Sequence, residues 1–153
     1  MIVTVLLVIH GLLAVLLLGA LTHQTIGVWR LKPLTKVEFF VRLANVRATS
    51  YTNTILALYL LVMIGGGIIY PTYVLDIKSS LTDARMLSAI GAFEIKEHFA
   101  VIGLALLPSY WYFWQRTGKE HTLVRKLNTT LLSLLVWWNF LVGHILNNIK
   151  GMI

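Results

Sequence analysis

The sequence of 153 residues contains no cysteine. This absence excludes disulfides, thiolate zinc sites, iron–sulfur clusters, cysteine nucleophiles and covalently attached c-type haem. Charged residues are also scarce, at 12% of the chain against about 25% in an average soluble domain. Hydrophobic residues make up 58%, which is more apolar surface than a soluble fold of this size can bury. The length suits one compact domain, so we expect a single membrane domain over residues 1–153.

The few charges are confined to short windows, which are residues 30–47, 76–97 and 116–126, with Lys150 alone near the end. Four uncharged stretches lie between these windows, at residues 1–29, 48–75, 98–115 and 127–149. Each stretch is long enough to cross the membrane as a helix, which takes roughly 17–25 residues. A helix also satisfies its backbone polar groups internally, as lipid requires. The sequence therefore predicts an all-α fold, an integral membrane four-helix bundle, with helices at about 2–29, 48–70, 93–115 and 128–149.

The distribution of basic residues predicts how the bundle is oriented. Window 30–47 has five basic residues and one acid, and window 116–126 has four basic residues and one acid. Window 76–97 has three basic and four acidic residues. By the positive-inside rule the first and third windows face the cytoplasm, so both termini lie on the outer, periplasmic side of a bacterial cytoplasmic (inner) membrane. The net charge of +7 is thus an orientation signal, and nucleic acid is not expected as a partner.

Several shorter features refine this plan. Residues 34–47 have the pattern of a short amphipathic helix on the inner membrane surface, or of the start of the second membrane helix. The second helix is expected to end at Tyr70-Pro71, and residues 71–93 are expected to form an outer loop with a surface helix around residues 80–92. Within it, Gly65-Gly66-Gly67 allows close approach of another helix, or of a planar cofactor. Thr52 and Asn53 are expected to form hydrogen bonds across helices.

Histidines carry the candidate chemistry, because ionisable residues inside membrane segments are rare and usually functional. His10, His98 and His144 belong to three different predicted helices and fall in the outer part of the bundle. Imidazole binds zinc, copper, iron and nickel, and haem b needs only axial side-chain ligands and an apolar slot. Two of these histidines are candidate axial ligands, and the third is a candidate hydrogen-bond donor to a propionate. His23 is expected to lie at the inner membrane interface, near Gln24.

Two carboxylates accompany one of these histidines. Glu94, Glu97 and His98 are spaced i, i+3 and i+4, so they share one face of a helix. A carboxylate there can fix the tautomer of a ligand histidine or bind a metal itself, and it can relay protons at the outer surface. The alternative interpretation is an ordinary charged helix start, because acids are favourable near helix N-termini.

The segment from Val8 to His23, VIHGLLAVLLLGALTH, resembles the first helix of four-helix membrane cytochrome b and copper-resistance-D-like proteins. The resemblance implies the four-helix plan and His10 as a haem ligand. Those families often carry two histidine pairs at two depths, and this sequence has only the outer group.

Three functions follow from these features. The first is a haem b membrane protein that transfers electrons, alone or as a redox-complex subunit, to or from a quinone or an outer-side redox protein. The second is a histidine-based copper or zinc site that uses His10, His98 and His144 with Glu94 or Glu97. The third is a non-catalytic accessory subunit, held by other membrane subunits or by copies of itself. A stand-alone enzyme is less expected, since no nucleophile–base pair can be placed.

Overall fold

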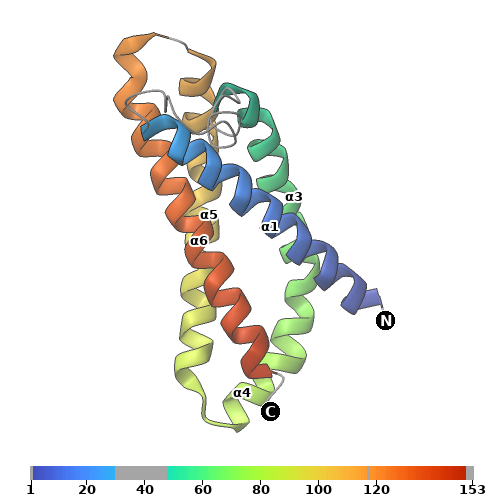
Figure 1. Cartoon of the computed structure of the whole chain (residues 1–153). Coiled ribbons are helices and arrows are strands. Elements are labelled where there is room, and N and C mark those ends of the chain that lie inside the picture. The colour runs from blue at the N-terminus through green and yellow to red at the C-terminus, as the bar shows by residue number, and fades with distance from the viewer. Residues whose placement is uncertain (1, 30–47, 117, 151–153) are drawn as a thin grey trace, which may run out of the picture.

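The computed structural model describes residues 2–29, 48–116 and 118–150, and this part of the chain is all-α (Figure 1). It has four long helices and several short helical segments. In chain order these are α1 (Ile2–Trp29), η1 (Ala48–Tyr51), α3 (Thr52–Thr72), η2 (Tyr73–Lys78), α4 (Ser79–Asp83), α5 (Leu87–Gln115), η3 (Lys119–His121) and α6 (Thr122–Lys150). The predicted amphipathic segment 34–47 lies outside the described residues.

The main departure from expectation is the polar segment between the second and third long helices. Helix α3 does not end at Pro71; it passes through this residue to Thr72 and continues as a π-helical turn and then α4, up to Asp83. Membrane helices tolerate an internal proline because local π-helical adjustments satisfy the freed backbone groups. Helix α5 begins at Leu87, six residues before the expected start. The predicted outer loop is therefore a tight turn at residues 84–86, where Arg85 has a positive φ of 55°.

Three helical stretches of the described residues are long and apolar enough to cross a membrane, namely Ile2–Trp29, Thr49–Asp83 and Lys119–Asn148. Their surfaces carry many exposed large hydrophobic side chains, as expected for contact with a lipid bilayer. Helix α5 is not in this group, because Glu94, Lys96 and Glu97 add charge to its first half, and proline, tyrosine and tryptophan lower the hydropathy of its second half.

The four long helices alternate in direction along one bundle (Figure 1). Helix α1 packs against α3 and α6, and α5 packs along α6 and more sparsely against α3. We call the end with the 116–121 turn the loop end. We call the opposite end, with the N-terminus, the 84–86 turn and the C-terminal end of α6, the terminal end.

Packing is densest toward the loop end, where apolar and polar side chains from all four helices are buried together. The fully buried apolar residues include Leu21, Ile55, Tyr110 and Leu132. Between them Tyr110 donates a hydrogen bond to Oε1 of Gln24 at 2.6 Å, and Gln24 in turn donates to Thr52 at 3.5 Å. Trp111 donates to Asn53 at 3.2 Å. The expectation that Thr52 and Asn53 bond across helices is confirmed.

Helix α1 is fixed to α6 only over its second half. Trp137 donates a hydrogen bond to Thr22 at 3.0 Å, and Trp29 donates to Thr130 at 2.7 Å. From this contact α1 leans away from α6 and across α3 toward the terminal end (Figure 1). The terminal half of the bundle is therefore the less tightly closed half, and the histidines singled out in the sequence lie there.

Candidate functional site

His10 belongs to the buried face of α1. It precedes the buried residues Leu17 and Leu21 by 7 and 11 positions, which is about two and three full helical turns. Its imidazole is half-buried, and within the described part of the chain its Nδ1 atom has no hydrogen-bond partner. The backbone of Val62 in α3 also interacts with the ring. A buried ring nitrogen without a partner costs free energy, so this atom marks a candidate binding position.

Glycines of α3 provide the space that the imidazole of His10 occupies. A Cβ atom at Gly65 would lie 3.2 Å from Nδ1 of His10, and a Cβ atom at Gly66 would lie 3.4 Å from its Cε1. A side chain at Gly65 would therefore displace the ring. The glycine run allows close approach, as expected, and the group that approaches is His10 of α1.

His144 lies on α6, one helical turn beyond Phe140, which packs against the core. The two rings stack with their centroids 6.3 Å apart and an interplanar angle of 4°. His144 is nevertheless exposed.

His98 does not lie on the buried face of its helix, α5. It is exposed, and its Nδ1 atom is 2.7 Å from the backbone oxygen of Glu94. The buried residue Leu107 follows nine positions later, which is about two and a half turns, on the opposite side of α5. Of the three predicted histidines, only His10 is thus packed against another helix, and His98 and His144 are both exposed.

The two glutamates of the predicted cluster have separate partners. Glu94 forms an ion pair with Lys78 at 2.9 Å, and both side chains are largely exposed. Glu97 forms an ion pair with Lys96 at 2.7 Å. Among the residues that the structure describes, no three or more His, Asp or Glu side chains lie close enough together to hold a metal ion.

Lys96 is a residue of this region that sequence reasoning missed. Only 20% of its side chain is exposed, and its ammonium lies 4.6 Å from the centre of the Phe93 ring. Its Cε atom would be 3.5 Å from a Cβ atom at Gly143, the residue before His144. The charges of Lys96 and Glu97 also act on His10. The available signal was its spacing, since Lys96 precedes the buried Gly103 by seven positions, about two turns.

The terminal half therefore holds two close contacts between helices, His10 of α1 on Gly65 and Gly66 of α3, and Lys96 of α5 beside Gly143 of α6. Away from these groups, His23 is half-buried at the loop end, with its ring 5.0 Å from that of Tyr51.

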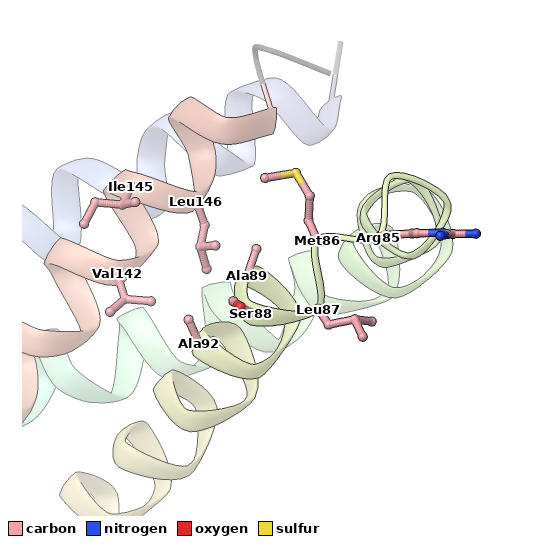
Figure 2. A pocket seen from close by; sticks show the side chains of 9 residues that line it. All are labelled: Arg85, Met86, Leu87, Ser88, Ala89, Ala92, Val142, Ile145 and Leu146. Atoms are coloured by element: carbon pink, nitrogen blue, oxygen red, sulfur yellow. The ribbon is translucent and has the colours of Figure 1, made fainter.

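A cavity in the described residues lies at the terminal end, between the start of α5 and the end of α6 (Figure 2). Its volume is about 430 Å³, and its lining is mostly apolar, from residues such as Met86, Ala89 and Leu146. Arg85 borders it but points away from the other lining side chains (Figure 2).

Comparisons of the chain with known protein families, with curated proteins and with solved structures find no significant match.

Proposed function

We propose that this chain is a haem b-binding membrane protein that transfers electrons, alone or as a subunit of a redox complex, with one haem near the outer face of a bacterial inner membrane. His10 and His144 are the proposed axial ligands. The observation that carries the proposal is the buried, unpartnered Nδ1 atom of His10 inside an apolar bundle. Iron ligation would satisfy this imidazole, and haem b needs no cysteine.

The residues around His10 fit a haem better than a bare metal ion. A haem takes at most two protein ligands, and His10 and His144 supply one imidazole from each of two neighbouring helices. A copper or zinc site takes three or four donors, and no such group occurs among the described residues. Glycine at positions 65 and 66 keeps the His10 side of α3 free of other side chains.

The haem would supply one-electron chemistry, and the protein would supply its position and surroundings. Apolar side chains of the bundle would shield the iron from water, which would influence its reduction potential. A site in the outer half lies within reach of a quinone in the bilayer or of a redox protein at the outer surface. In this proposal α5 crosses the membrane as the fourth span, because it packs along α6 for much of its length.

An absorption spectrum of the detergent-purified protein tests the proposal. We expect a Soret band in the wild type that His10→Ala and His144→Ala each abolish or strongly reduce. His98→Ala is the matched control, since it removes an imidazole from the exposed face of α5, and it should keep the full band.

Three results would contradict the proposal. A colourless wild type that copurifies with a larger membrane complex would favour an accessory subunit. Copper or zinc in place of iron in elemental analysis would favour the bare metal site. Loss of the band in His98→Ala, with retention in His10→Ala, would show that His98 and not His10 is the haem ligand.

A further inference from the structure

Lys96 is a cation in an unusual position for a membrane helix. Lysines near helix ends usually extend their ammonium groups toward water, but this side chain is four-fifths buried. Its aliphatic part lies along α6, where Gly143 has no side chain to exclude it. The ammonium rests over the Phe93 ring at 4.6 Å. Burial of this stem directs the charge toward the inside of the terminal half.

The side chain of Lys96 lies beside α6, next to one of the proposed haem ligands. Its Cε atom adjoins Gly143, the neighbour of His144 in the chain. A buried ammonium needs an anion nearby, and Glu97 at 2.7 Å supplies one. Glu97 is itself half-buried and adjacent in sequence, so the ammonium retains donors that a single carboxylate oxygen does not use.

Haem b carries two propionates, which are carboxylates and therefore complementary to an ammonium. We propose that Lys96 binds a haem propionate and so fixes the orientation of the haem between His10 and His144. The inference rests on the proposed function. Lys96 acts as a positioning residue: its ammonium donates a charge-assisted hydrogen bond to the propionate, and charge-assisted bonds are about twice as strong as neutral ones.

The experiment compares haem with its dimethyl ester, in which both propionates are uncharged. The full-length chain in detergent is titrated with each compound, and binding is followed by the Soret band. We expect the wild type to bind haem about tenfold more tightly than the ester, which corresponds to about 1.4 kcal/mol. Lys96→Met should lose this preference by weakening haem binding while leaving ester binding nearly unchanged.

Two further variants make the test specific. Lys78→Met is the matched control, because Lys78 also forms an ion pair with a glutamate at the terminal end, at 2.9 Å from Glu94, but its side chain is 41% exposed against 20% for Lys96. It should retain the preference for haem. Lys96→Arg keeps the cation and should restore most of the preference, which a role for Lys96 in packing alone would not predict.

Each contrary outcome has a distinct meaning. Equal binding of haem and ester by the wild type, or equal weakening of both by Lys96→Met, would overturn the role of Lys96 and leave the haem site standing. A loss of preference in Lys78→Met as large as in Lys96→Met would also overturn it. Failure of the wild type to bind either compound would overturn the proposed function itself.

Discussion

At the scale of single residues, some buried polar side chains form hydrogen bonds with one another and others have no hydrogen-bond partner in the described structure. Toward the loop end, the hydroxyl of Tyr110 and the amide of Gln24 are fully buried and hydrogen-bonded. Toward the terminal end, Nδ1 of His10 and the hydroxyl of Tyr73 are buried without hydrogen-bond partners in the described structure. Satisfied networks stabilise a fold, whereas unsatisfied buried groups point to function or to an absent partner.

Tyr110→Phe measures how much the hydrogen bond between Tyr110 and Gln24 contributes to stability. The change removes the hydroxyl that donates to Gln24 at 2.6 Å and leaves the ring in place. Hydrogen bonds between membrane helices contribute about 0.6 kcal/mol on average and up to about 1.7 kcal/mol. We expect a loss in this range in the free energy of unfolding, measured by titration with sodium dodecyl sulfate. Tyr112→Phe, at an exposed position, should change stability by less.

The sequence predicted the depth of the histidines better than the faces on which they lie. Depth follows from counting residues along a helix, so the assignment of His10, His98 and His144 to one half of the bundle needed no contacts. Their faces follow from which neighbours are buried, and only the structure shows that His98 lies opposite Leu107. Lys96 was treated as part of a charged window, although its spacing from Gly103 places it on the buried face.

At the scale of elements, apolar stretches predict where the helices form, but charged residues and proline do not reliably predict where these helices end. Helix α1 covers the predicted residues, because a continuous apolar run predicts both of its ends. The polar segment 71–93 was interpreted as an outer loop with a surface helix around residues 80–92, but nearly all of it is helical. Charge excludes a segment from the hydrocarbon core and does not prevent a helix from continuing beyond it. The proline at position 71 misled for a similar reason, since it disrupts a helix in water more than in this setting.

One of the contacts between α3 and α5 depends on a small residue. Tyr59 of α3 is buried and donates a hydrogen bond to the backbone oxygen of Ala100 at 2.8 Å, and its hydroxyl end occupies the space beside Gly103. Gly103→Ala would push a methyl group into the phenol ring. Overpacking of this kind typically costs about 1–3 kcal/mol, and we expect a decrease of that size in the unfolding free energy.

Gly91→Ala provides the control on the same helix. A Cβ atom at Gly91 would meet nothing within 4 Å, so this variant should be neutral or slightly stabilising through its higher helix propensity. Equal destabilisation by the two substitutions would show that the Gly103 effect does not come from Tyr59. Restoration of stability in a Gly103→Ala, Tyr59→Phe double variant, beyond the sum of the single changes, would support the contact directly.

At the scale of the whole molecule, the bundle is a scaffold with two unequal halves. Hydrogen bonds from Trp29 and Trp137 hold α1 to α6 in the loop half, and no comparable bond between these helices occurs in the described terminal half. A rigid half beside a more open one suits a protein that must admit a planar group at one end. The same difference explains why the side chains of the candidate site are buried less tightly than those of the core.

The orientation of this scaffold gives the final prediction, and the absence of cysteine makes it simple to measure. Asp83 ends α4 at the terminal end, and Lys119 lies in the 116–121 turn at the loop end. Nine of the 13 basic residues fall in windows 30–47 and 116–126, which follow α1 and α5 in the chain, so the positive-inside rule predicts that the loop end faces the cytoplasm. A membrane-impermeant maleimide added to spheroplasts should label Asp83→Cys and should label Lys119→Cys only after the membrane is opened.

Because α5 lies between these two positions, labelling of both from the same side would show that α5 does not cross the membrane. The fold would then have three spans, and its termini would lie on opposite sides of the membrane. The reversed pattern would keep four spans but move the histidine site to the cytoplasmic face, where a redox partner at the outer surface could not reach it.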